Sequence, residues 1–258
     1  MKHTAKTICL LLGLVIGSSL VKAEEKKNLN IVFIGNSITA GALMSDPSHD
    51  APPVRAALYI SRQISVASVK YSNQGVSGCT TVDYLPQTET LFPKAKAAAD
   101  KFADETWATL VFSIMLGTND SAIKGTNGAP VSPETYKENM TTIINKLLAL
   151  YPKCKIVLNR PIWYSPNTYN GSMYLKEGLL RLESYYPVLV ALVEEYATRF
   201  PGQVLMGDTE AFDYFKDNYQ TDLFPEDGNA GIFYLHPNIK GGIKLGEFWG
   251  KAIMKAVE

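Results

Sequence analysis

The chain has 258 residues, of which 25 are Lys or Arg and 25 are Asp or Glu, and 46% of its residues are hydrophobic. This apolar fraction excludes an intrinsically disordered protein, and the length suffices for a large core without a stabilising metal or disulfide. The balanced charge argues against a nucleic-acid-binding protein, which would carry an excess of basic residues.

The N-terminal segment has the pattern of a secretory signal peptide. Two lysines precede an uncharged stretch, residues 7–21, and Val21 and Ala23 provide the small residues of a cleavage site. The uncharged stretch is too short for a comfortable membrane span. We therefore expect residues 1–23 to be removed on export to the periplasm or the extracellular space. Residues 24–258 are then one mildly acidic domain without a membrane span.

The rest of the chain alternates between apolar runs and amphipathic stretches. The predicted strands are residues 30–34, 68–71, 109–115, 155–158 and 203–206, and most of them are continuous apolar runs. The predicted helices cover about residues 53–63, 93–103, 133–150 and 174–200. Ser132 followed by Pro133 is typical of a helix start. Strands that alternate with helices indicate a parallel sheet with right-handed crossovers. The sequence thus predicts one doubly wound α/β domain with a five-stranded parallel sheet.

Only two cysteines, Cys79 and Cys154, follow the expected cleavage site. Cys79 comes just after the end of one predicted strand, and Cys154 stands at the start of another. Opposite ends of a strand lie ~17 Å apart, whereas a disulfide requires Cα atoms within ~7 Å. We therefore expect both cysteines to be unpaired.

Candidate catalytic residues follow the predicted strands. Ligands bind at the carboxyl ends of the strands in such a sheet. Ser37, Gly75 and Asn119 follow the first, second and third strands, and His236 precedes the last helical segment. A serine nucleophile needs a base to accept its proton and preorganised donors for the oxyanion. No Cys/His cluster or set of carboxylates at metal-ligand spacing occurs, so we expect no metal site.

Over essentially the whole length after residue 23, the sequence resembles the SGNH hydrolase family, also called the GDSL esterase/lipase family. The resemblance rests on the segments Gly35-Asn36-Ser37-Ile38-Thr39, Asn73-Gln74-Gly75-Val76-Ser77-Gly78, Gly117-Thr118-Asn119-Asp120 and Leu235-His236-Pro237-Asn238. It implies a flavodoxin-like three-layer α/β/α sandwich without a cofactor, in which Ser37 is the nucleophile and His236 the base. It also assigns the oxyanion hole to the N–H groups of Ser37 and Gly75 and to the side chain of Asn119.

One position departs from the family pattern. The family usually carries an Asp three residues before the His, where it orients the imidazole, and this position is Phe233 here. Asp227 or Glu226 in the preceding loop is a candidate replacement. Asp227 is preferred only slightly, because the Asp-Gly turn signal could instead fix it in a structural role. The alternative is a Ser–His dyad whose ring is oriented by a backbone carbonyl.

The segment 161–174 follows the fourth predicted strand and contains one Trp and three Tyr. Its rings either stack on sugar rings beside Ser37 or cover the core, and the sequence leaves both alternatives open. Asp120, next to Asn119, is expected to be structural.

The sequence predicts an exported serine esterase that hydrolyses short-chain esters, acetyl esters above all, through an acyl-enzyme intermediate. Its substrate is a small-molecule or glycan ester, and no nucleic acid is expected as a partner. A catalytically impaired carbohydrate-binding protein, a lipase and an acyltransferase are the alternatives. Oligomeric state and natural substrate are not indicated by the sequence.

Overall fold

The computed structural model describes residues 25–258. The expected signal peptide, residues 1–23, lies outside the described residues. Within residues 25–258, no helix is both long enough and apolar enough to cross a membrane.

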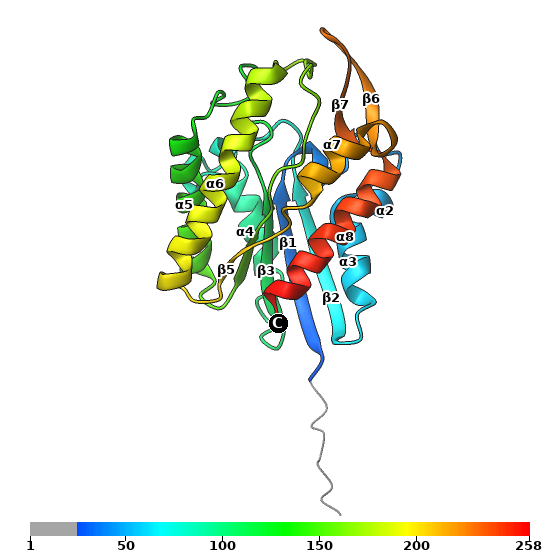
Figure 1. The fold of residues 1–258 in the computed structure, drawn as a ribbon. Helices are drawn as coiled ribbons and strands as arrows, with labels where there is room; N and C mark the ends of the chain where they lie inside the picture. Colours follow the sequence, from blue (N-terminus) through cyan, green and yellow to red (C-terminus); the bar gives the residue numbers. More distant parts are fainter. Residues whose placement is uncertain (1–24) are drawn as a thin grey trace, which may run out of the picture.

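Five parallel strands form the central sheet in the order β2-β1-β3-β4-β5 (Figure 1). They are β1 (Lys27–Gly35), β2 (Val66–Gly75), β3 (Thr109–Met115), β4 (Lys155–Leu158) and β5 (Val204–Met206). The consecutive β1 residues Ile31, Val32 and Phe33 are all fully buried, as expected for a strand whose two faces are both covered. The predicted five-stranded parallel sheet is confirmed, and its strand order is that of the flavodoxin-like fold.

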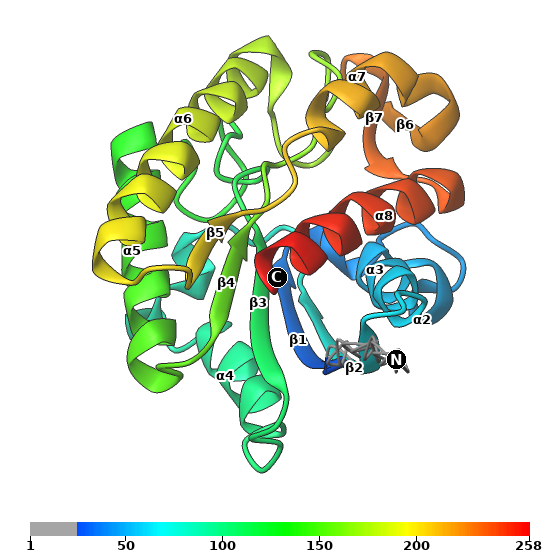
Figure 2. The same ribbon diagram turned by 60° about the horizontal axis from the view of Figure 1, so that its bottom comes forward.

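Helices cover both faces of this sheet and produce three layers (Figure 2). The longer ones are α3 (Pro52–Ser61), α4 (Phe92–Asp100), α5 (Pro133–Leu150), α6 (Leu175–Arg199), α7 (Ala211–Asp222) and α8 (Ile239–Ala256). The loops contain the one-turn helices α1 (Ser37–Ala40) and α2 (Pro47–Asp50) and the 3₁₀ turns η1 (Val82–Tyr84) and η2 (Pro86–Thr88). α3 and α8 pack together on one side, with α7 beside α8, whereas α4, α5 and α6 lie on the other side.

The start of α5 is the one predicted from the sequence. The Ser132 hydroxyl oxygen accepts a hydrogen bond from the Thr135 N–H at 3.2 Å, and Pro133 occupies the first helical position. Proline costs nothing there, because the first N–H of a helix has no acceptor within the helix.

The segment before the last helix, where the sequence predicts a loop, forms a β-hairpin. β6 (Leu223–Gly228) pairs antiparallel with β7 (Gly231–Pro237), and the hairpin projects beyond the carboxyl ends of the sheet strands (Figure 1). The Asn167 side chain donates hydrogen bonds to the carbonyls of Ala230 and Ile232, at 3.2 and 2.7 Å. Because an isolated two-stranded hairpin is only marginally stable, these bonds to a neighbouring loop help to hold it.

On the C-terminal side of this hairpin, α8 packs closely against α3. One face of α8 carries a glycine at every fourth position: Gly242, Gly246 and Gly250. A Cβ atom on Gly246 would lie 2.8 Å from the backbone nitrogen of Ala56 in α3, so the two helices approach more closely than larger residues allow. Trp249 stacks on Phe33 of β1, with ring centroids 6.0 Å apart. Because α8 begins two residues after the last residue of β7, this packing also fixes the end of β7 relative to the sheet.

Cys79 and Cys154 are both buried and form no disulfide within residues 25–258, as predicted. Cys79 lies beyond the end of β2, whereas Cys154 directly precedes β4.

Candidate active site

Ser37 lies at the carboxyl end of β1, in the first position of the one-turn helix α1. The Asn36 side chain caps this helix, since its oxygen accepts a hydrogen bond from the Ile38 N–H at 3.0 Å. As the first N–H of the helix, the Ser37 N–H has no helical acceptor. Ser37 is only 9% exposed, and its hydroxyl lines a small pocket.

His236 lies in β7, next to the last residue of that strand, and its ring reaches Ser37. The His236 Nε2 and Ser37 Oγ atoms are 2.8 Å apart, within hydrogen-bond distance. A neutral imidazole in this position can accept the serine proton, provided that its other nitrogen carries the hydrogen. The structure thus brings together the two residues that the sequence analysis singled out as nucleophile and base.

Glu226 provides the carboxylate that faces the other ring nitrogen of His236. Its Oε1 and Oε2 atoms lie 2.9 and 3.0 Å from Nδ1, and Oε1 also accepts a hydrogen bond from the His236 backbone N–H at 3.1 Å. In the hairpin, Glu226 is the cross-strand partner of Phe233. Side chains of directly opposite residues share one face of a two-stranded sheet. The carboxylate therefore comes from the strand opposite the usual Asp position.

The slight preference for Asp227 over Glu226 was wrong. Successive side chains along a strand point to opposite faces, so only one of these two neighbours can face the imidazole. Along β6, Pro225 and Asp227 are exposed, whereas Glu226 is partly buried. The alternation would have identified Glu226 if the hairpin had been predicted, but Pro225 and the Asp-Gly pair favoured a loop.

Asn119 follows β3 and lines the same pocket. Its Nδ2 donates a hydrogen bond to the Cys79 carbonyl at 2.8 Å, which leaves the second Nδ2 hydrogen without that acceptor. The adjacent Asp120 is fully buried and accepts a hydrogen bond from the Thr81 N–H at 2.9 Å. Burial raises the pKa of Asp120 to about 6. Asp120 therefore joins the loop after β3 to the segment before η1.

The structure does not bring Gly75 to this pocket. The Gly75 N–H donates to the Asn73 side-chain oxygen at 2.9 Å, so it is already engaged. A Cβ atom on Gly75 would lie 2.3 Å from the backbone nitrogen of Ala40, which shows that this glycine allows α1 to pack on β2. Gly78, three residues later, lines the pocket instead and has a positive φ of 78°. Among the described residues, no acceptor takes the Gly78 N–H.

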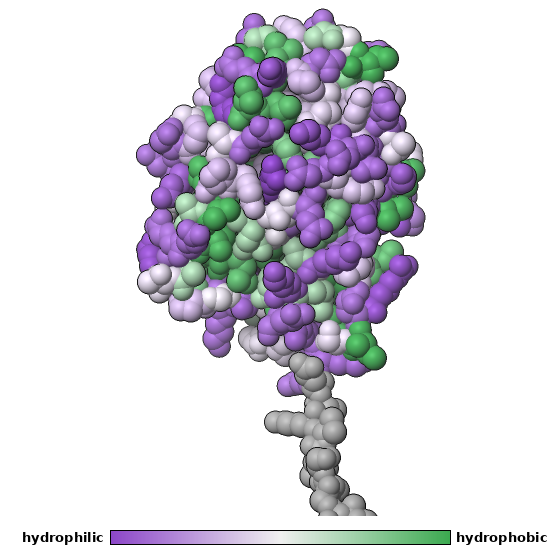
Figure 3. All heavy atoms as spheres, viewed as in Figure 1, coloured by the Kyte–Doolittle hydropathy of each residue, from purple (hydrophilic) through white to green (hydrophobic). Residues whose placement is uncertain are grey.

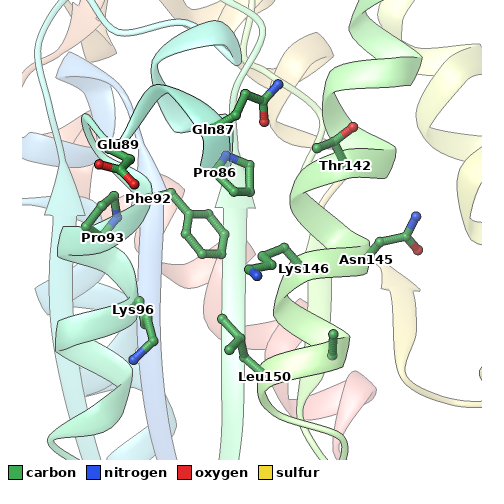
Figure 4. A pocket seen from close by; sticks show the side chains of 11 residues that line it. Pro86, Gln87, Glu89, Phe92, Pro93, Lys96, Thr142, Asn145, Lys146 and Leu150 are labelled. Atoms are coloured by element: carbon green, nitrogen blue, oxygen red, sulfur yellow. The ribbon is translucent and has the colours of Figure 1, made fainter.

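The pocket is small, and most of the residues that line it have polar side chains. Its volume is about 210 Å³, and it is lined by Ser37, Ala42, Ser77, Gly78, Asn119, Thr126, Asn170, Ser172, Tyr174, Leu235 and His236. A larger hollow of about 820 Å³ lies between α4 and α5 (Figure 4), but it shares none of these residues. In residues 25–258, no group of three or more His, Cys, Asp and Glu side chains is placed to hold a metal ion.

The aromatic segment 161–174 mainly covers the core. Trp163, Tyr164 and Tyr174 are 7%, 0% and 3% exposed, and Trp163 packs against Tyr219 of α7. Of the four rings, only that of Tyr174 lines the pocket. Of the two alternatives, the structure favours the core-covering role.

Comparison with known sequences identifies a related family. The sequence profile described as the GDSL-like Lipase/Acylhydrolase family matches residues 33–242, which is most of the chain. Comparison with curated protein sequences gives no match.

Comparison with solved structures gives many similar folds. A carbohydrate acetylesterase from Sinorhizobium meliloti is 16% identical, with a TM-score of 0.58 and coverage of 88% of this chain and 99% of that one. An acetylxylan esterase from Geobacillus stearothermophilus is 20% identical, with a TM-score of 0.57 over 91% and 96% of the two chains. A putative GDSL-like lipase from Parabacteroides merdae is 18% identical, with a TM-score of 0.60 over 88% and 96%. At these identities, the likeness establishes a shared fold.

The geometry predicts that Ser37 is the residue that reacts with a fluorophosphonate probe. The reagent should phosphonylate Ser37, because the neighbouring imidazole can accept its proton as the bond forms. Peptide mass spectrometry of the labelled protein identifies the modified residue. Ser77 is an internal control, since it lines the same pocket without a ring nitrogen in hydrogen-bond contact. Labelling at Ser77 with Ser37 unmodified would contradict the assignment.

Proposed function

The chain belongs to the GDSL-like lipase/acylhydrolase family and is a carboxylic-ester hydrolase; on that premise we propose that it removes short acyl groups, acetyl above all, from hydroxylated substrates such as glycans. The observation that carries the proposal is the chain of contacts from Ser37 Oγ to His236 Nε2, and from His236 Nδ1 to Glu226. These contacts support a complete Ser-His-Glu triad beside a small pocket lined mainly by residues with polar side chains.

In the proposed reaction, Ser37 Oγ attacks the ester carbonyl carbon while His236 Nε2 accepts the hydroxyl proton. The Glu226 carboxylate accepts a hydrogen bond from Nδ1–H, so it holds the required tautomer and stabilises the imidazolium that forms. His236 then gives the proton to the leaving alcohol, and an acyl group remains on Ser37. Water hydrolyses this acyl-enzyme by the same steps, with His236 acting again as base and then as acid.

Three donors are proposed to stabilise the oxyanion of the tetrahedral intermediates. They are the N–H groups of Ser37 and Gly78 and the Nδ2 hydrogen of Asn119 that Cys79 does not use. We assign to Gly78 the oxyanion-donor role that the family resemblance implied for Gly75, because the Gly75 N–H already donates to the Asn73 side chain. Such donors are most effective when they are already fixed in place before charge develops.

The size and lining of the pocket support a small acyl group. Its volume of about 210 Å³ is small, and most of its lining side chains are polar. On the face drawn in Figure 3, apolar residues form separate groups among polar ones. These features favour a short-chain esterase over a lipase, which binds long acyl chains.

A neighbouring hollow supports a hydroxylated, uncharged substrate. This hollow of about 360 Å³ shares Ser77, Gly78, Thr126 and Ser172 with the catalytic pocket and adds polar groups from Asp83, Thr90 and Asn127. Neither hollow is lined by a Lys or Arg, so neither is built to bind a phosphate or a carboxylate. Hydroxyl and amide groups in this arrangement suit the hydroxyl groups of a sugar, and two proteins of similar fold are a carbohydrate acetylesterase and an acetylxylan esterase.

The alternative of an impaired carbohydrate-binding protein rested on the missing acid at position 233. Glu226 stands in hydrogen-bond contact with His236, so this reason no longer holds. Nothing in the site specifically favours an acyltransferase.

Export is also part of the proposal. Residues 1–23 carry the charged start, uncharged stretch and small-residue cleavage pattern of a signal peptide. The proposed mature enzyme begins at Glu24 and acts in the periplasm or outside the cell.

The first test of the proposal compares acyl chain lengths. The wild-type protein should hydrolyse 4-nitrophenyl acetate with a kcat/KM at least ~10-fold above that for the octanoate, because added methylenes do not fit the pocket. Initial rates below the micellar concentration measure both. Ser37→Ala should abolish both activities while leaving the melting temperature nearly unchanged. A kcat/KM that rises with chain length would instead identify a lipase.

The second test separates the two neighbouring acids of the hairpin. Glu226→Gln should lower kcat by about three to four orders of magnitude, because a neutral amide no longer stabilises the imidazolium or fixes its tautomer. Asp227→Asn is the matched control, since it makes the same change one residue away on the exposed face and should leave kcat within about two-fold. Equal losses in the two variants would exclude the proposed triad.

The third test concerns export. When the full chain is expressed in a Gram-negative host, N-terminal sequencing of the periplasmic protein should start at Glu24. Ala23→Asp should block cleavage, because signal peptidases require a small residue before the cleaved bond. Recovery of the wild-type protein from the cytoplasm with residues 1–23 intact would rule out the signal peptide.

A further inference from the structure

The Asn119 amide is held from two sides by buried groups. On one side, Nδ2 donates to the Cys79 carbonyl at 2.8 Å. On the other side, the Tyr174 hydroxyl donates to Oδ1 at 2.6 Å. Tyr174 is 3% exposed and lies 55 residues from Asn119 in sequence, just before α6. No feature of the sequence analysis connected these two residues.

These two contacts define which end of the amide faces which neighbour. A carbonyl oxygen can only accept, so it requires the NH₂ group of Asn119 on the Cys79 side. The oxygen of the amide must then face Tyr174, whose hydroxyl has a hydrogen to donate. In the reversed orientation, two oxygens would face each other at Cys79. The observed orientation leaves one Nδ2 hydrogen without an acceptor among residues 25–258, on a residue that lines the pocket.

Tyr174 is suited to act as a permanent donor. Burial raises its pKa well above the normal value for tyrosine, so the hydroxyl keeps its proton at neutral pH. Its ring packs edge-on against Tyr164, with centroids 5.4 Å apart. Its carbonyl accepts a hydrogen bond from the Gly178 N–H at 2.8 Å, which anchors the residue to the first turn of α6.

We propose that Tyr174 is a positioning residue of the oxyanion hole, which holds the Asn119 amide in the orientation that donates to the developing charge. This inference rests on the proposed function, because it assigns Asn119 to the oxyanion. Tyr174 acts through Asn119 and takes no part in proton transfer. The hydroxyl, rather than the ring, is therefore the group that matters.

The experiment removes this hydroxyl alone. Tyr174→Phe should lower kcat for 4-nitrophenyl acetate by about 10-fold with KM nearly unchanged, because an Asn119 amide without its Tyr174 contact donates less well to charge that develops only in the transition state. Tyr164→Phe is the matched control: its hydroxyl is also buried and bonded, to Ser121 at 2.9 Å, and belongs to the ring packed against Tyr174. This control should leave kcat within about two-fold.

A double-mutant cycle shows whether Tyr174 acts through Asn119. Asn119→Ala should lower kcat on the order of 100- to 1,000-fold. If Tyr174 only orients this amide, adding Tyr174→Phe to Asn119→Ala should cause no further loss. A further 10-fold loss in the double variant would overturn the proposal, as would an unchanged kcat in Tyr174→Phe alone.

The orientation of the amide can also be measured without turnover. Isotope-edited NMR should show changed Asn119 side-chain NH₂ signals in Tyr174→Phe and unchanged signals in Tyr164→Phe. Unchanged Asn119 signals in both variants would overturn the positioning role. A wild-type protein that hydrolyses no ester would refute the proposed function, and the NMR comparison would still decide whether Tyr174 orients Asn119.

Discussion

The hydrogen bond between Ser37 and His236 joins residues 199 positions apart in the sequence. Its formation therefore depends on how the sheet, the helices and the hairpin pack together. Ser37 is placed by β1, the buried strand next to β2 and β3 in the sheet. His236 is placed by the hairpin on one side and by α8 on the other. The glycine face of α8 against α3 and the stacking of Trp249 on β1 bring these separate parts into register. A 2.8 Å contact leaves little tolerance for a shift of either part.

Much of the site could be predicted because parallel sheets place the ends of their strands at one edge. Apolar runs located the strands, so Ser37 and Asn119 followed from their positions after β1 and β3. The same logic pointed to Gly75, which does not line the pocket, rather than to Gly78, which does. Gly75 and Gly78 occur in one short segment after the second apolar run, and the sequence shows neither where β2 ends nor that Asn73 engages the Gly75 N–H. A local side-chain contact decided between them.

The parts that the sequence did not predict depend on pairing between distant residues. Glu226 reaches His236 because β6 and β7 pair in one particular register, and a shift by one residue would have turned Asp227 inward instead. Tyr174 contacts Asn119 because the segment 161–174 folds back over the loop after β3. Such contacts leave no periodic pattern along the chain. The sequence shows that this segment is rich in aromatic residues. It does not show that the Tyr164 and Tyr174 hydroxyls form hydrogen bonds with the buried side chains of Ser121 and Asn119.

The carboxylate that faces His236 comes from Glu226, which lies on a different strand from the position where the family usually carries this acid. In the family pattern, the acid stands three residues before the histidine, at the position of Phe233, on the same strand as the base. In this chain it stands on the facing strand, opposite that position. Positions 226 and 233 lie opposite each other on the two strands of the hairpin. With the acid at position 226, position 233 can hold an apolar side chain, and Phe233 is buried there. The order of the proposed catalytic residues along the chain is therefore a weaker constraint than their arrangement in space, because a carboxylate on the facing strand reaches the same imidazole.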